Sequence, residues 1–134
     1  MTSKLVLDNI AGRTTAGSIT IVGEGNSTTT NLQHGLAKAW GSFEDDATIA
    51  ATNTSFNIAS ISDDATGSYT YTFTNNMAYE SDDTPWGGNC GGSARFLRSN
   101  NTNSTTSAVS VKVHNTSGTD VDNTNRWALH GDLA

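Results

Sequence analysis

The most regular feature of the chain is an alternation of apolar residues with hydroxyl-bearing or other polar residues. Residues 68–74 alternate tyrosine or phenylalanine with serine or threonine, and residues 108–114 place three valines at every second position. Successive side chains of a β-strand point to opposite faces, so a period of two predicts strands with one buried face. Ser18–Val22 and Arg126–His130 show the same period over shorter runs and are also predicted strands.

Further strands and turns complete an all-β pattern. Asp63–Gly67 is rich in turn-forming residues and predicts a hairpin loop of about five residues. Helical periodicity is not convincing anywhere, although a short turn near Leu32–Leu36 fits the sequence. Short strands at this spacing predict an antiparallel β-sandwich of jelly-roll-like type. Four segments that alternate less regularly are additional strand candidates: Leu36–Phe43, Thr48–Ala51, Ser55–Ser62 and Ala94–Arg98.

The first 35 residues differ from the rest of the chain. They alternate weakly, carry five glycines and hold too few apolar residues to bury a core of their own. We therefore predict that residues 1–35 form an extended N-terminal arm for contacts with other subunits or with a particle, and that residues 36–134 form the sandwich. The candidate inter-subunit residues of the arm are Leu5, Val6, Leu7, Ile19 and Ile21.

A second unusual segment, Asn75–Ser93, is predicted to be a long loop. Loops of this length are uncommon in compact domains and often carry function. Tyr79, Asp82, Asp83 and Trp86 make it a candidate receptor-contact loop, and the alternative is a loop folded back over its own tryptophan. The other aromatic residues fall in strand candidates and are predicted core residues: Trp40, Phe43, Phe56, Tyr69, Tyr71, Phe73, Phe96 and Trp127.

Composition narrows the class of protein. Threonine, serine, asparagine and glycine supply 63 of the 134 residues, whereas leucine, isoleucine, valine and phenylalanine supply only 23. Such a low share of large apolar residues is typical of disordered chains, but a net charge of −6 is too small to keep the chain unfolded by self-repulsion. The chain has no apolar run long enough for a membrane helix, and its seven scattered cations argue against nucleic-acid binding. We expect a β-rich domain whose core is completed by partners.

Candidate chemistry is sparse. Cys90 is the single cysteine, so an intrachain disulfide is impossible, and the first ten residues lack the apolar run of a signal peptide, which favours folding in a cytosol. The three histidines lack a metal-ligand spacing, and the acids lie in polar turns rather than in a pocket. Asp120 and Asp122 have the initial spacing of a calcium loop without its glycine or distant glutamate. We expect no catalytic residue, no metal and no cofactor.

Several segments, taken in order, carry a resemblance to a known group of proteins. They are Asp8–Ile19, Gly23–Gly25, Thr30–Trp40, Ser55–Asp63, Gly67–Thr74 and His130–Ala134. Together they resemble the small tail-fibre-like and virion-surface decoration proteins of marine bacteriophages. The resemblance implies a non-enzymatic virion component, a homotrimer exposed on the particle and assembled in the cytoplasm of the bacterial host. Residues 75–103 depart from the pattern, so nothing is carried over to them.

Two placements on the virion follow from this resemblance. A capsid decoration protein, of the cement or head-fibre kind, would brace the shell against the major capsid protein. A tail-fibre tip would instead join tail proteins and contact a host surface glycan or protein. The short chain with its apolar arm favours decoration. A third function, a polysaccharide depolymerase, would need acids that converge in a groove, and neither nucleic acid nor membrane insertion is expected.

Overall fold

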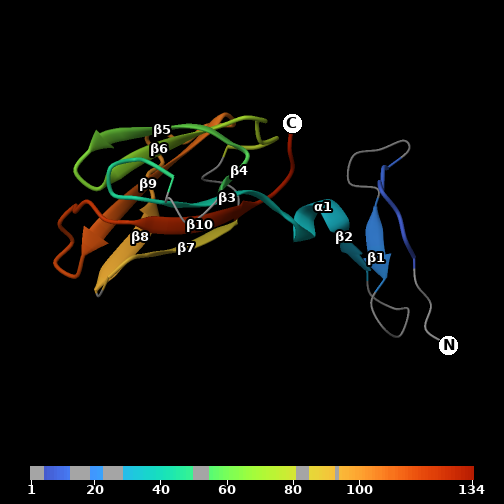
Figure 1. Cartoon of the computed structure of the whole chain (residues 1–134), viewed down its shortest axis with the longest axis horizontal. Helices are drawn as coiled ribbons and strands as arrows, with labels where there is room; N and C mark the ends of the chain where they lie inside the picture. Colours follow the sequence, from blue (N-terminus) through green and yellow to red (C-terminus); the bar gives the residue numbers. More distant parts are fainter. Residues whose placement is uncertain (1–4, 13–18, 23–28, 50–54, 81–84, 93) are drawn as a thin grey trace. The chain divides into compact units, whose positions relative to one another are not determined.

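The computed structural model describes residues 5–12, 19–22, 29–49, 55–80, 85–92 and 94–134 (Figure 1). The chain divides into two compact units, Met1–Gly35 and Leu36–Ala134, and each is described here by itself. Strands make up most of the second unit and form a short hairpin in the first, and all strand pairs are antiparallel. The prediction of an all-β protein with antiparallel sheets is confirmed, with one short helical turn as the exception.

The first unit contains a small hairpin followed by a helical turn. Strands β1 (Thr20–Val22) and β2 (Thr29–Asn31) pair antiparallel, with Thr20 opposite Asn31. The turn α1 (Leu32–Gly35) follows directly, and its first N–H, from Leu32, donates to the backbone oxygen of Ile19 at 2.9 Å. The strand predicted at residues 18–22 is therefore present from Thr20 onward, and Ser18 lies outside the described residues.

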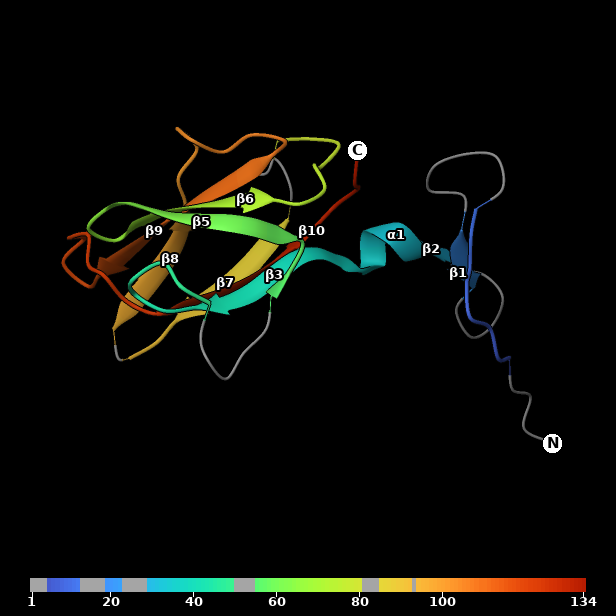
Figure 2. The same ribbon diagram turned by 45° about the horizontal axis from the view of Figure 1, so that its top comes forward.

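The second unit consists of two four-stranded sheets (Figures 1 and 2). One sheet has the order β4-β3-β10-β7 and the other the order β5-β6-β9-β8. The arrangement is sandwich-like, with side chains from both sheets in a shared core, while the jelly-roll-like connectivity stays a prediction. The strands are β3 (Ala37–Phe43), β4 (Ser55–Phe56), β5 (Ile58–Ala65), β6 (Ser68–Phe73), β7 (Trp86–Cys90), β8 (Arg95–Ser99), β9 (Ala108–Asn115) and β10 (Asn125–His130).

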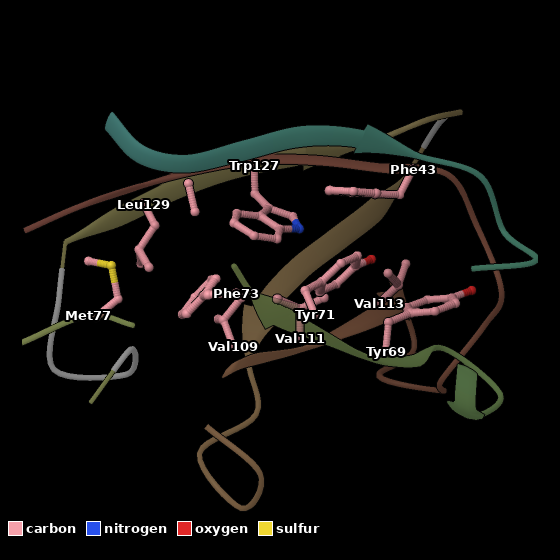
Figure 3. Close-up of a cluster of buried hydrophobic side chains, with 11 residues drawn as sticks. Phe43, Tyr69, Tyr71, Phe73, Met77, Val109, Val111, Val113, Trp127 and Leu129 are labelled. Carbon is pink, nitrogen blue, oxygen red and sulfur yellow. The ribbon is translucent and has the colours of Figure 1, made fainter. Parts of the chain in front are cut away.

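The core lies where the alternating runs of the sequence place it. Every second residue of β6 and β9 is buried against inward residues of β3 and β10, as Figure 3 shows. The buried cluster comprises Ala39, Phe43, Tyr69, Tyr71, Phe73, Met77, Val109, Val111, Val113, Trp127 and Leu129. Its centre is aromatic: the ring centroids of Phe43 and Tyr71 lie 4.4 Å apart, and those of Tyr71 and Trp127 lie 5.0 Å apart in an edge-on arrangement.

Glycines make room for these rings. The residues directly opposite Trp127 are Gly41 on β3 and Gly88 on β7. The cross-strand positions on both sides of the tryptophan therefore carry no side chain. A Cβ added to Gly41 would lie 2.3 Å from the end of the Phe43 ring, far inside van der Waals contact. A large inward ring on a central strand thus requires small residues beside it.

Buried hydroxyl groups are anchored by hydrogen bonds between distant segments. The Tyr71 hydroxyl donates to Oδ1 of Asn125 at 2.8 Å, with both residues fully buried. The Tyr69 hydroxyl donates to the backbone oxygen of Asp45 at 3.1 Å. Burial raises the pKa of Tyr69 to about 12 and that of Tyr71 further, because a phenolate would lose its hydration there.

Several details of the strand prediction are wrong. The predicted loop Asn75–Ser93 contains strand β7, which pairs with β10. The predicted strand Ser55–Ser62 is two strands in different sheets, separated at Asn57, whose φ of 61° turns the chain. In the segment Thr48–Ala51, Ile49 forms only an isolated bridge to Phe43.

The hairpin between β5 and β6 is present, but its loop is shorter than predicted. Strand β5 continues through Ala65, so only Thr66 and Gly67 form the turn. Gly67 has a φ of +66°, and its N–H donates to Oδ1 of Asp122 at 2.6 Å. The turn is therefore held by a carboxylate from the other end of the sequence, an interaction that local turn chemistry does not contain.

Candidate functional site

The outer face of the β4-β3-β10-β7 sheet carries two exposed aromatic side chains. Trp40 and Phe56 are opposite residues on β3 and β4, and their side chains are 39% and 48% exposed. Their ring centroids lie 6.4 Å apart with planes only 20° from parallel. Single exposed apolar residues are ordinary on protein surfaces, whereas two neighbouring exposed rings form a contiguous apolar patch, which makes this face a candidate for binding.

The position of Trp40 follows from the inward residues of its strand. Ala39 and Phe43 of β3 are fully buried in the core, so the intervening Trp40 points to the opposite face. The prediction that Trp40 and Phe56 are core residues is wrong for this reason. Phe96 of β8, also predicted as core, is 59% exposed on the other sheet, because its neighbour Leu97 packs inward.

The aromatic pair continues into a row of small residues. Trp40 is opposite Ala128 of β10, and Ala128 is opposite Gly87 of β7. A Cβ placed on Gly87 would meet nothing within 4 Å, so the space above this end of the row is open. We call the four residues Phe56, Trp40, Ala128 and Gly87 the aromatic shelf. Its rings stand at one end, and no side chain longer than a methyl group rises from the other.

Beside the shelf lies a polar row with a cation. Arg126 of β10 is opposite Ser42 on one side and Asn89 on the other, and Arg126 and Asn89 are exposed. Lys38 lies on the same face of β3, although it is buried. Among the described strand residues of this face none is acidic, in a chain whose net charge is −6. The strand residues of this face therefore carry positive charge, and the acids nearest to them along β3 are Glu44, Asp45 and Asp46, which follow the end of the strand.

The outer face of the second sheet holds a charged cluster around Asp120. Lys112 donates to Oδ2 of Asp120 at 3.0 Å, and Nδ1 of His114 lies 2.7 Å from Oδ1. Arg98 donates from Nε to Nε2 of His114. The hydrogen bond from Lys112 is the main reason that the pKa of Asp120 lies below its ordinary value. His114 lies on this outer face, and its side chain is only 13% exposed.

These contacts bear on the calcium spacing noted in the sequence. Asp120 is engaged by Lys112 and His114, and Asp122 accepts the N–H of Gly67, so the two carboxylates serve different structural roles. Within the described ranges, no group of three or more histidine, cysteine or acidic side chains is arranged to hold a metal ion.

Most of the predicted arm residues are exposed. Leu5 and Val6 are 81% and 72% exposed, and Leu7 and Ile21 are each about half exposed. Ile19 differs, because it is half-buried and accepts the hydrogen bond that starts α1. The described part of the first unit therefore presents aliphatic side chains to solvent rather than packing them into a core.

The candidate receptor-contact residues do not share one environment. Tyr79 is largely exposed, whereas Trp86 begins β7 and packs in part against the core cluster. Asp82 and Asp83 lie outside the described residues. Cys90 ends the same strand opposite Asn125, and burial raises the pKa of its thiol, which disfavours the reactive thiolate.

Comparison with known proteins identifies no relative: no protein family matches the chain, and neither a curated protein nor a solved structure is significantly similar to it. No helical segment in the described ranges has the length and hydropathy needed to cross a membrane.

Proposed function

We propose that the chain is a non-enzymatic structural protein of the bacteriophage virion surface, most consistent with a capsid decoration protein that assembles as a homotrimer through residues 1–35. The virion location and the trimer come from the sequence resemblance. The observation that carries the assembly role is the exposure of the aliphatic side chains in the first unit. The arm role of this unit and a jelly-roll-like second unit are parts of the same proposal.

Solvation energy supports assembly through this unit. Burying one valine or leucine side chain is favourable by roughly 1.5–3 kcal/mol. Leu5, Val6 and Leu7 are consecutive and all more than half exposed, and Ile21 and Val22 add to the exposed aliphatic surface. Covering such side chains with neighbouring copies would gain several kcal/mol per subunit, and exposed apolar groups of this kind are typical of interaction sites.

Charge supports the same assignment. Residues 1–35 contain two basic and two acidic residues, so this unit is neutral, whereas residues 36–134 contain five basic and eleven acidic residues and carry the whole net charge of −6. Contacts between two copies of the second unit would meet electrostatic repulsion, which contacts between first units would avoid.

In this proposal, strand β7 is the acceptor for the extended arm. It is an edge strand of five residues without charge, whereas β4, the other uncharged edge strand, has only two residues. The edge strand β5 contains Asp63 and Asp64, and the edge strand β8 contains Arg95 and Arg98. Hydrogen bonds to β10 flank the strand at both ends, which directs the N–H and C=O groups of Gly88 toward the free edge. Charged edge strands resist pairing with other chains, and an uncharged one permits strand addition.

The test compares assembly of the full chain with that of a double variant, Leu5→Ser with Leu7→Ser. Sedimentation equilibrium should give three chains per particle for the native protein and a smaller species for the variant. Phe96→Ser, which removes an exposed apolar side chain from the second unit, is the matched control and should assemble normally. A native chain that is monomeric at high concentration, or a double variant that still forms trimers, would contradict the proposal.

Placement on the particle is tested by copy number. A decoration protein should be present in virions at a stoichiometry comparable with that of the major capsid protein, and a tail-fibre tip at only a few copies. The exposure of Tyr79 favours the tail-fibre alternative, in which this residue contacts a host surface molecule together with Asp82, Asp83 and Trp86. Unchanged phage adsorption after exchange of residues 75–93 would count against that alternative.

A further inference from the structure

We propose that the aromatic shelf and Arg126 form a binding surface for an acidic polysaccharide. In this assignment sugar rings stack on Trp40 and Phe56, and a carboxylate or sulfate group of the polymer pairs with Arg126. The site lies entirely in the second unit, and its two rings are on β3 and β4, away from the edge strand β7.

The two rings supply a rigid apolar surface on which a sugar ring can stack. Trp40 and Phe56 lie on paired strands with nearly parallel ring planes, and each is exposed over much of its surface. A pyranose ring has one face of C–H groups and a rim of hydroxyls, so it fits an apolar ring surface with polar groups beside it. Aromatic side chains bind in this way at low entropic cost because they have only two rotatable bonds.

The rest of the shelf allows an extended ligand to lie across the sheet. Ala128 and Gly87 continue the row from Trp40 to the edge strand β7, and the space above Gly87 is open. Four strands at the usual spacing give this row a length of roughly 14 Å. A polymer chain is therefore a better match to the surface than a single small ligand.

The charge of the face selects an anion. Arg126 is two residues from Ala128 on the same face of β10 and is diagonal to Trp40 across the strand pair, within reach of a group bound over the shelf. The described strand residues of the face include no acid, although the chain carries −6 overall. Glu44 is the nearest acid along β3 and lies four residues from Trp40, roughly 13 Å along the strand, whereas Arg126 is only two residues from Ala128 in the shelf. Because charges are screened over about 8 Å at physiological salt, Arg126 acts on a group bound over the shelf more strongly than the acids beyond the strand.

Other occupants fit less well. A second copy of the chain would bring another acidic second unit against this one. A surface that binds an apolar protein partner would have large aliphatic side chains around the two rings. The residues beside them are instead small or polar: Ala128, Gly87, Ser42, Asn89 and Arg126. Hydrogen-bonding side chains next to exposed rings favour a saccharide.

The test is affinity electrophoresis of the full chain in gels that contain alginate or polygalacturonate, with dextran and laminarin as neutral polymers. The native protein should be retarded by at least one of the two polyuronates. Trp40→Ala and Phe56→Ala should each weaken binding by about tenfold, the order of loss seen when other stacked rings lose an aromatic partner. Arg126→Gln should remove the preference for the polyuronate over the neutral polymers. Circular dichroism and the urea midpoint show that each variant is folded.

Phe96→Ala is the matched control, because it removes an aromatic side chain that is at least as exposed, from the other sheet. It should bind like the native protein. The proposal is overturned if neither polyuronate retards the native chain, or if Phe96→Ala weakens binding as much as Trp40→Ala. It is also overturned if Trp40→Ala leaves retardation unchanged and instead dissociates the assembled protein, since the shelf would then be an interface between copies.

Discussion

Gly41→Ala tests how tightly the aromatic core is packed. The added Cβ would lie 2.3, 2.9 and 3.0 Å from three atoms of the Phe43 ring. Ordinary contacts begin near 3.4 Å, so the ring has to move by about 1 Å. It has little room to do so, because Tyr71 and Trp127 lie against it with centroid distances of 4.4 and 5.5 Å.

The expected magnitude combines two opposing effects. Overpacking of a core costs about 1–3 kcal/mol. Gly41 does not have a positive φ, so alanine adopts its backbone without strain and gains about 0.4–1 kcal/mol by restricting the unfolded chain. The net expectation is a loss of about 1–2 kcal/mol, which lowers Tm by roughly 4–10 °C.

Urea denaturation followed by circular dichroism measures this loss as a lower midpoint at an unchanged slope. Gly87→Ala is the matched control, because it makes the same substitution in the same sheet where a Cβ meets nothing within 4 Å. The control should be neutral or slightly stabilising. In the double variant Gly41→Ala with Phe43→Leu, the smaller side chain relieves the clash, so the total loss should be less than the sum of the single losses by about 1 kcal/mol.

The reasoning is refuted if Gly41→Ala is as stable as Gly87→Ala. Strictly additive losses in the double variant would show that the clash with Phe43 is not the cause of any destabilisation.

Three further predictions follow from the buried and paired groups. Tyr71→Phe should lower the free energy of unfolding, measured by urea denaturation, by about 1–3 kcal/mol, because Oδ1 of Asn125 loses its donor in the core. Tyr79→Phe, at an exposed site, should change it by less than about 0.5 kcal/mol. Equal effects of the two substitutions would contradict the role of the buried hydrogen bond. Stability should fall in two steps as the pH rises. A small loss begins near pH 9, because the unfolded chain releases the thiol proton there while burial raises the pKa of Cys90, and a larger loss follows above about pH 10, where the tyrosines of the unfolded chain ionise while burial holds the pKa of Tyr69 near 12. A urea midpoint that does not change from about pH 8 to the folded-state pKa of Tyr69 would refute this. Asp120→Asn should lower the free energy of unfolding by less than about 1 kcal/mol at neutral pH, since the pair with Lys112 is partly exposed. This difference in stability from the native chain should shrink as the pH falls below about 4, because the carboxyl group of the native chain then becomes protonated. A difference in stability that is independent of pH would show that the charge of Asp120 is not involved.

Part of the fold was predictable because strand periodicity is a local property. The alternation in residues 68–74 and 108–114 identified β6 and β9 and the inward position of Tyr69, Tyr71 and the three valines. The short run at residues 126–130 likewise identified β10 and the burial of Trp127 and Leu129. In each of these segments one face is clearly more apolar than the other, so the period of two predicts a strand and the apolar face predicts which side of it is buried.

The candidate site was not predictable on the same grounds. Trp40 has small residues on both sides and a phenylalanine three positions later, so the run around it has no single apolar face. Strand β7, with two glycines and one asparagine among its five residues, has a composition that favours loops and becomes a strand only through pairing with β10. A tryptophan flanked by alanine and glycine within a strand is the one local signal that could have indicated an exposed ring.

The sequence by itself determined that the protein is β-rich, which residues of the regular runs share a face, and that its acidic charge belongs to residues 36–134. Only the tertiary structure decided which face of β3 turns inward, that β10 lies between β3 and β7, and that Asp122 holds the turn at Gly67. The physical reason is that a period of two leaves two equivalent choices of buried face. Contacts with residues far away in the chain select between them, and at β3 the packing of Phe43 against Tyr71 and Trp127 places Trp40 in solvent.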